Sequence, residues 1–181
     1  MKSDTDQVLL SRPLKVDELK DEASGEITAS EAERKAIAKM LDLVALERLA
    51  FTYRLTRGGE GRLHLTGRLA ANVTQTCVVS LDPVATRLDI PVEVDFWPAF
   101  LLEALESNSE EPGHTGLLDW PEAIVDGKID LGPLVYEALA TALDPYPKRP
   151  GASFDWSQQD PEQAEISRTG PFAALAALKR R

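Results

Sequence analysis

Residues 49–73 read LAFTYRLTRGGEGRLHLTGRLAANV, in which apolar and polar side chains alternate on both sides of a glycine-rich turn. Alternation with a period of two is typical of a β-strand that has one buried and one solvated face. The turn, residues 58–61, consists of three glycines and Glu60, which suit a hairpin reversal. The sequence therefore predicts two antiparallel strands. Their apolar faces contain Leu49, Phe51, Tyr53 and Leu55 before the turn, and Leu63, Leu65, Leu69, Ala71 and Val73 after it.

The register of this hairpin follows from the requirement that both apolar sets lie on one face. The predicted pairs are Leu55 with Leu63, Tyr53 with Leu65, Phe51 with Gly67 and Leu49 with Leu69. Arg54 then faces His64 on the polar face, and the Phe51 ring covers the bare backbone of Gly67. A slip by one residue would expose every leucine of the hairpin.

The flanking segments predict an α+β fold, in which an antiparallel β meander or barrel-like sheet packs against a few helices. Ser30 and Glu33 form a capping-box pattern, and Asp130 is a good N-cap before leucines and alanines at helical spacing. Further strands are predicted at 8–10, 84–96 and 122–125, and helices at 31–43, 99–105 and 131–143. These elements together predict one domain over residues 1–150.

Three segments are predicted to lie outside this packed core. Residues 103–122 carry several acidic residues without any Lys or Arg, which indicates a mobile acidic loop. Residues 151–169 are rich in Pro, Gly, Ser, Gln and Asp and predict a polar linker. Residues 170–181 predict a short helix that either docks on a partner or completes the core. Its docking side chains would be Phe172, Leu175, Leu178, Lys179, Arg180 and Arg181.

Composition excludes several classes of function. The 181 residues carry a net charge of -10, so any contact with nucleic acid must be local. One cysteine and two histidines are too few for a disulfide framework or a thiolate metal site, and we predict no metal and no cofactor. The sequence shows no secretory signal and no apolar run that could span a bilayer. We therefore expect a cytoplasmic protein that does not interact with membranes.

No catalytic pattern stands out. Cys77 and His64 are the only thiol and imidazole that could be paired, but their parity places them on opposite faces of the strand. Motifs such as the P-loop, G-x-G-x-x-G, G-x-S-x-G and H-E-x-x-H are absent from the sequence. The sequence predicts no enzyme and no small-molecule substrate.

Charge distribution singles out the hairpin. Residues 48–87 contain six arginines and only two acidic residues, Glu60 and Asp82, which gives this stretch a net charge of +4. Arg54, His64 and Arg68 share its polar face, and Arg57 and Arg62 flank the turn. These five residues form a candidate site for RNA phosphates. An equally weighted interpretation is a solvated sheet face whose arginines pair with acidic neighbours.

Three motifs carry a resemblance to a known family. They are TCVVSLDPV at 76–84, the Ile129-Asp130-Leu131 and LDPYP (143–147) pair around the predicted helix, and GPFAALAALK at 170–179. In order and spacing they resemble the YceD-like family of large ribosomal RNA subunit accumulation proteins, a bacterial family also catalogued as a domain of unknown function. The family usually has C-x-x-C where this chain has Cys77 and Ser80. Because a hydroxyl is a poor zinc ligand, any metal or redox role of that pair should be lost here.

The resemblance implies a non-enzymatic factor in 23S ribosomal RNA accumulation and large-subunit assembly. Its direct partner would be ribosomal RNA or a large-subunit ribosomal protein. The alternative function is an acidic adaptor or chaperone, whose loop 103–122 holds a basic ribosomal protein.

Overall fold

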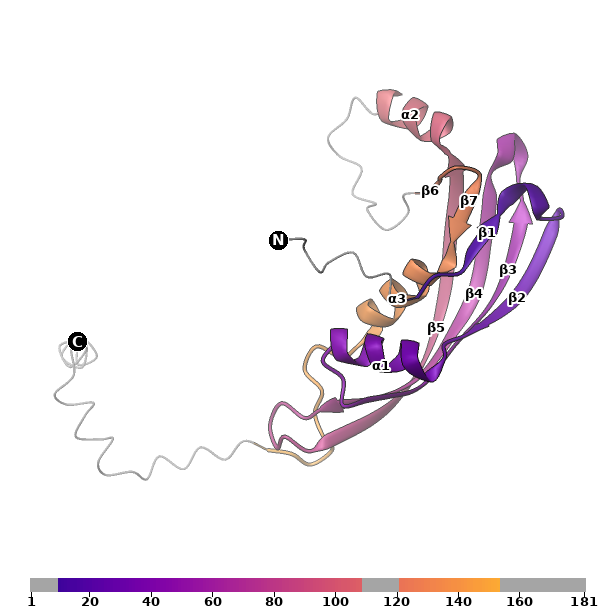
Figure 1. Cartoon of the computed structure of the whole chain (residues 1–181). Coiled ribbons are helices and arrows are strands. Elements are labelled where there is room, and N and C mark those ends of the chain that lie inside the picture. Colours follow the sequence, from indigo (N-terminus) through magenta and orange to yellow (C-terminus); the bar gives the residue numbers. More distant parts are fainter. Residues whose placement is uncertain (1–9, 109–120, 154–181) are drawn as a thin grey trace, which may run out of the picture. The chain divides into compact units, whose positions relative to one another are not determined.

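The computed structural model describes residues 10–108 and 121–153 of the chain. There, a five-stranded sheet has the order β2-β3-β4-β5-β6, and a separate pair joins β1 to β7 (Figure 1). The strands are β1 (Pro13–Lys15), β2 (Glu22–Thr28), β3 (Ala45–Arg57), β4 (Leu63–Thr76), β5 (Pro83–Pro98), β6 (Glu122–Ile124) and β7 (Lys128–Asp130). The helices are α1 (Glu31–Met40), α2 (Ala99–Asn108) and α3 (Leu131–Ala142), with 3-10 turns η2 (Val16–Glu18) and η3 (Gly59–Gly61).

The sheet is open. Strands β3, β4 and β5 form the predicted antiparallel meander, β2 pairs antiparallel on the other side of β3, and β6 pairs in parallel with Phe96–Pro98 of β5 only. β2 and β6 are the two edges, so the α+β class is confirmed and the barrel-like closure is wrong. Closure would need the first and last strands to pair, whereas here the last long strand, β5, leads into a helix.

The β3–β4 hairpin is confirmed, but its predicted register is wrong by two residues. Leu55 lies opposite Leu65, Tyr53 opposite Gly67, Phe51 opposite Leu69 and Leu49 opposite Ala71. Arg54 therefore faces Thr66, and His64 faces Thr56. The turn is longer than predicted because Glu60 and Gly61 adopt left-handed φ angles of 60° and 76°, and Gly58 N donates to Arg62 O at 2.9 Å. A two-residue shift keeps every side chain on its face, so the apolar pattern fits both registers equally well.

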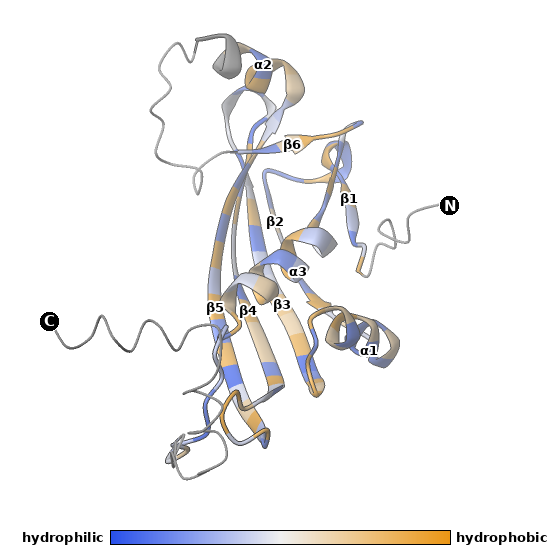
Figure 2. Cartoon of the chain, turned by 90° about the vertical axis from the view of Figure 1, so that its left-hand side faces the viewer, coloured by the Kyte–Doolittle hydropathy of each residue, from blue (hydrophilic) through white to orange (hydrophobic). Residues whose placement is uncertain are grey.

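The core lies between one face of the sheet, called the inner face here, and the elements that cover it. α1 packs on β3, α3 crosses β4 and β5, and the β1–β7 pair lies on the same side (Figures 1 and 2). The most deeply buried side chains of this cluster are Leu49, Phe51, Leu55, Leu65, Leu69 and Val73 of the hairpin, Ile37 of α1, and Leu131, Val135 and Leu139 of α3. Burying each large apolar side chain stabilises the fold by about 1.5–3 kcal/mol. The opposite, outer face carries mainly polar and small side chains.

α1 begins where the capping box predicts. Ser30 Oγ accepts the Glu33 N–H, and the Glu33 carboxylate accepts the Ser30 N–H. The helix ends at Met40 and not at residue 43, because Asp42 has a φ of 52° and Leu43 N donates to Ala38 O at 2.9 Å. Glu33 also accepts two hydrogen bonds from the Arg12 guanidinium, at 2.9 and 3.0 Å, which fix the chain before β1 to this helix.

The N-terminal part differs most from the prediction. Leu10 lies in a bend, and residues 8–9 lie outside the described residues, so no strand is described at 8–10. Instead β2 forms an edge strand that the sequence did not predict, since its inward-facing positions are Ala23, Gly25 and Ile27, of which only Ile27 is a large apolar residue. Tyr53 provides the packing that β2 lacks, because a Cβ added to Gly25 would lie 2.6 Å from the Tyr53 hydroxyl.

The polar segments are described only in part. α2 extends to Asn108, so residues 103–108 of the predicted acidic loop are helical, as their Leu, Ala and Glu content favours. Residues 109–120 lie outside the described part, as do 154–169 of the predicted linker and the whole segment 170–181. The division into 1–150, 151–169 and 170–181 stays a prediction. β5, β6 and α3 lie within two residues of their predicted bounds.

Candidate nucleic-acid interface

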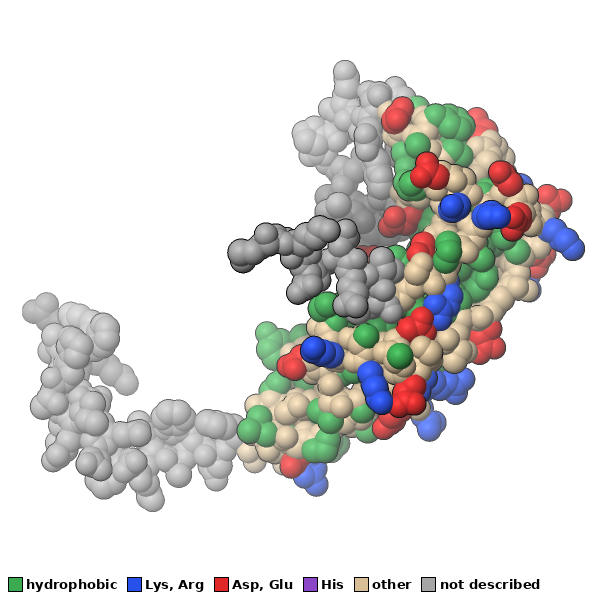
Figure 3. Space-filling view, in the orientation of Figure 1, with side chains coloured by type: hydrophobic (Ala, Val, Ile, Leu, Met, Phe, Trp, Pro, Cys, Tyr) green, Lys and Arg blue, Asp and Glu red, His purple; other side chains and the backbone are tan. Residues whose placement is uncertain are grey.

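The outer face of the sheet carries the polar residues of the hairpin and of its neighbours β2 and β5. Cross-strand pairing places Arg54 and His64 near the turn and Arg68 further along β4. On the side of the molecule that Figure 3 shows, basic and acidic side chains lie next to one another, and on the outer face the ion pairs join neighbouring strands. The predicted site residues therefore have acidic neighbours on adjacent strands.

Each outer-face residue of the predicted set has a carboxylate partner. Arg68 Nη1 lies 2.7 Å from Asp89 Oδ2 of β5, and Arg54 Nη1 lies 3.3 Å from Glu22 Oε1 of β2. His64 Nδ1 is 2.7 Å from Asp95 Oδ1, and its Nε2 is 3.6 Å from Glu93 Oε1. These are exposed pairs of the kind that contributes about 0–1 kcal/mol each.

The two arginines beside the turn serve the local structure. Arg57 Nη2 donates to Val16 O at 2.8 Å and to Leu19 O at 3.1 Å, which ties η2 to the hairpin. Arg62 pairs with Glu60 at 2.6 Å and stacks over the Trp97 ring, with 4.3 Å from its central carbon to the ring centroid. The five predicted residues thus do not converge on one point. Their contacts match the alternative interpretation, a solvated sheet face whose arginines pair with acidic neighbours, and their contact with RNA stays a prediction.

A second group on the outer face was not in the predicted site. The register places Arg48 of β3 opposite Asn72 of β4, and Asn72 opposite Arg87 of β5. Among the described residues neither arginine has an ion pair or hydrogen bond, in contrast to Arg54 and Arg68. The sequence shows both arginines, but only the observed register, with its irregularity between Leu46 and Arg48, aligns them. We call these three residues the Arg48–Asn72–Arg87 row.

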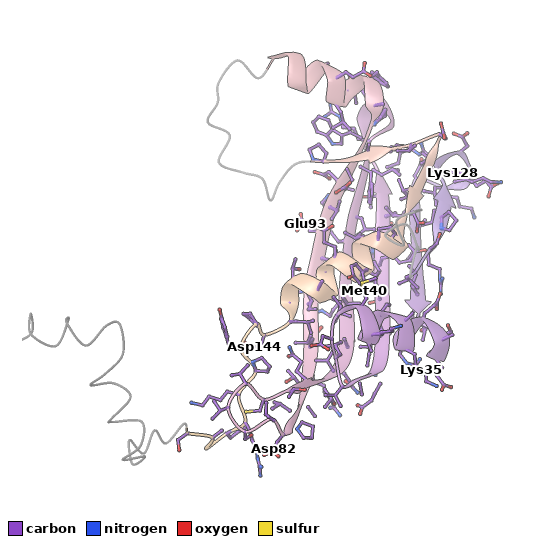
Figure 4. All side chains as sticks on the ribbon, turned by 60° about the vertical axis from the view of Figure 1, so that its left-hand side comes forward. Lys35, Met40, Asp82, Glu93, Lys128 and Asp144 are labelled. Atoms are coloured by element: carbon purple, nitrogen blue, oxygen red, sulfur yellow. The ribbon has the colours of Figure 1, made fainter. Side chains whose placement is uncertain are left out.

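Cys77 joins two distant segments at the end of β4. Its Sγ is fully buried and lies 3.4 Å from the backbone nitrogens of Ser80 and Arg149, and 3.5 Å from that of Val79. The Arg149 N–H, with the hydroxyl and N–H of Ser80, lowers the pKa of the thiol to about 6. Asp82 and Asp144 mark the two segments in Figure 4. The two segments are also joined by a hydrogen bond from Val78 N to Pro147 O at 2.9 Å and by an ion pair between Arg149 and Asp82 at 2.8 Å.

This arrangement explains the Ser80 position of the sequence motif. The Ser80 groups and the Cys77 sulfur are hydrogen-bonded to each other in a closed turn, completed by Cys77 N to Asp82 O at 2.8 Å. His64 lies at the other end of β4, so the structure does not bring the thiol and the imidazole together. In the described part of the chain no three His, Cys, Asp or Glu side chains gather as metal ligands.

The Ile129-Asp130-Leu131 motif is structural. Ile129 and Leu131 are buried in the core, and Asp130 caps α3 by accepting Gly132 N at 2.9 Å. The same carboxylate accepts Arg12 N at 2.6 Å and Ser11 Oγ at 2.7 Å. Asp130 therefore holds the N-terminal segment against the start of α3.

A surface pocket of about 410 Å³ lies between α1 and the start of β3. Its apolar lining is Ala38, Leu43, Val44, Ala45 and Leu46, and its polar rim is Glu31, Arg34, Lys35 and Lys39. Arg34 donates to Ala29 O at 2.7 Å and Lys35 to Glu31 at 2.6 Å, so Arg34 is held by the chain just before the helix and Lys35 by the helix itself. Lys35 and Met40 mark this helix in Figure 4.

The predicted docking residues Phe172, Leu175, Leu178, Lys179, Arg180 and Arg181 lie outside the described part, and their role stays a prediction. Of the helices that the structure describes, none has the length and apolar content needed to cross a membrane.

The fold and its contacts define a small α+β protein, with an open sheet that is covered on one face and bears charged pairs and a free arginine row on the other. A sequence model of one protein family, the large ribosomal RNA subunit accumulation protein YceD, matches residues 65–179. This is more than half of the chain, and the chain belongs to the YceD family. No curated protein and no solved structure matches it significantly.

Proposed function

We propose that this chain supports the accumulation of 23S ribosomal RNA, and thereby assembly of the large ribosomal subunit, in the cytoplasm and without catalysing a reaction. The observation that carries the proposal is the YceD family match over residues 65–179. That range contains most of β4, all of β5 and α3, and Cys77 with its hydrogen bond from Arg149 N.

A role without catalysis fits the contacts of the residues that could perform chemistry. Both ring nitrogens of His64 face carboxylates, and the Cys77 sulfur is enclosed by backbone N–H groups. A nucleophile needs a base within hydrogen-bond reach and access to a substrate. The Cys77 thiol has no such access because it is buried, and His64, at the other end of β4, is too far away to act as its base.

The proposal is tested in bacterial cells that lack the gene, with the full chain supplied from a plasmid. We expect the ratio of 23S to 16S ribosomal RNA and the amount of large subunits to fall without the gene and to return with the chain. A plasmid with an early stop codon is the control. An unchanged ratio in the deletion strain, at all growth temperatures, would contradict the proposal.

The nature of the direct partner is tested separately. The tagged chain is recovered under mild salt before and after ribonuclease treatment, and bound RNA and protein are identified in each sample. We expect ribosomal RNA in the untreated sample. A basic ribosomal protein that stays bound after ribonuclease would show a protein partner.

A further inference from the structure

We propose that the Arg48–Asn72–Arg87 row is a contact site for the phosphate backbone of RNA, an inference that rests on the proposed function and names its point of contact. Cross-strand pairing places the three residues side by side on the outer face, with Asn72 between the two arginines. Because neighbouring strands are about 4.8 Å apart, the two arginine backbones lie about 10 Å from each other. Two guanidinium groups at this spacing can engage successive or facing phosphates.

The outer-face arginines differ in whether they are free to bind a phosphate. Arg68 and Arg54 are held by Asp89 and Glu22, whereas Arg48 and Arg87 form no ion pair or hydrogen bond with the rest of the described chain. A guanidinium bound to a carboxylate must give up that contact before it binds a phosphate. The free pair has no such contact to lose.

The surroundings of the row leave room for an approaching RNA strand. The adjacent cross-strand row pairs Ala50 with Ala70, whose side chains are short, and then Asp89, which is engaged with Arg68. Glu47 precedes Arg48 in the chain, and the structure contains no ion pair between them. Both arginines are exposed.

The chemistry of the row favours the backbone of RNA over its bases. Guanidinium groups bind phosphate with two parallel hydrogen bonds, and the Asn72 amide can donate to a phosphate or sugar oxygen. Stacking on bases would need aromatic rings beside the row, but Phe51 and Tyr53 belong to the inner side of β3, and Trp97 lies at the far end of β5 with Arg62 over its ring. The row therefore recognises phosphates with little dependence on sequence.

The net charge of -10 restricts how this contact works. Overall repulsion opposes the approach of RNA, so binding depends on short-range pairs and is weakened by salt. Each phosphate contact contributes about 0.7–0.9 to the slope of log affinity against log salt concentration.

The test measures binding of the purified full chain to a transcript of large-subunit ribosomal RNA over a range of salt concentrations. Replacing both arginines, Arg48→Gln with Arg87→Gln, should weaken binding and reduce the salt slope by about 1.4–1.8. Arg48→Lys with Arg87→Lys should keep most of the slope, because Lys also binds phosphate as a point charge. The matched control is Lys39→Gln with Lys128→Gln, which removes the same charge from exposed residues of α1 and β7 and should leave the slope unchanged.

Three results of the binding measurement would overturn the inference. They are a wild-type chain that does not bind the transcript, an unchanged slope in the double Gln variant, or an equal loss in the Lys39/Lys128 control. The melting temperature of the double Gln variant should match the wild type, since neither arginine has a partner to lose. In cells, a double Gln variant that restores 23S ribosomal RNA as well as the wild type does would overturn the contact site and leave the proposed function standing. Failure of the wild-type chain itself to restore 23S ribosomal RNA would contradict the proposed function.

Discussion

The ring of Phe51 lies on the backbone of Gly67, although the two residues are not opposite each other in the hairpin. Phe51 is paired with Leu69, and its ring reaches diagonally across β4 to the glycine. A Cβ added to Gly67 would lie 2.5 Å from Phe51 Cε2 and 2.7 Å from Thr52 O. The glycine therefore makes room for an aromatic ring in the core.

Gly67→Ala should destabilise the protein by about 1–3 kcal/mol, because the Phe51 ring must leave its packed position. Chemical denaturation at neutral pH measures the free energy of unfolding. Gly59→Ala is the control, since a Cβ at that turn glycine would meet nothing within 4 Å. Equal stability of the two variants would show that the Phe51–Gly67 contact contributes nothing.

The Cys77 sulfur predicts a pH dependence of stability. Its pKa is about 6 in the folded chain and 9.0 for an unperturbed thiol, so the folded state favours the thiolate. A lowered pKa adds stability that is complete above pH 9 and is lost as the pH falls towards 6. The free energy of unfolding of the wild type, relative to Cys77→Ala at the same pH, should rise from pH 6 to pH 9. A constant difference over this range would contradict the lowered pKa.

Arg12 and Glu33 predict a second pH dependence at acidic pH. The side-chain hydrogen bonds from Arg12 lower the pKa of Glu33 to about 2, against burial, which raises it. Glu33→Gln keeps the capping geometry and removes the charge, and it should cost about 1 kcal/mol at pH 7. Because the stability added by the lowered pKa is complete above the unfolded value of 4.5 and is lost as the pH falls through the folded value, this cost should vanish as the pH falls from 4.5 towards 2. Glu31→Gln, which loses only the exposed pair with Lys35, should be nearly neutral.

Removal of the C-terminal segment is expected to impair function in cells without lowering the stability of the fold. The buried core of the described chain is formed by residues between Leu10 and Leu139. Because the sequence predicts a polar linker at 151–169 before a short docking helix, truncation after Thr169 should shift the melting temperature by less than about 2 °C while it reduces 23S ribosomal RNA in cells. A drop of more than about 6 °C would show that Phe172 and Leu175 complete the core.

The hairpin, the faces of its side chains and the capped starts of α1 and α3 could all be predicted, because each depends on local spacing. The register could not, since a shift by two residues preserves every face and the left-handed Glu60 sets the length of the turn. β2 was missed because its interactions are supplied from β3, by Tyr53 over Gly25.

The candidate site, like the fold, could be predicted only in part. The sequence identified Arg54 and Arg68 as a basic face but gave no information on which acids would neutralise them. Asp89 and Glu22 are respectively 21 and 32 positions away in the chain from the arginines that they bind, and only the folded sheet brings them together. The free row became visible for the same reason.

β6 pairs only with the last three residues of β5, Phe96–Pro98. Among the described strands, the edge of β5 that points away from β4 has no partner before Phe96. Pro91 lies in the middle of that stretch and has no N–H group to offer to another chain. Asp89 and Glu93 on either side of it add like charges that would face each other in a copy paired edge to edge. These features disfavour edge-to-edge pairing of two copies along this part of β5, although the sheet is open.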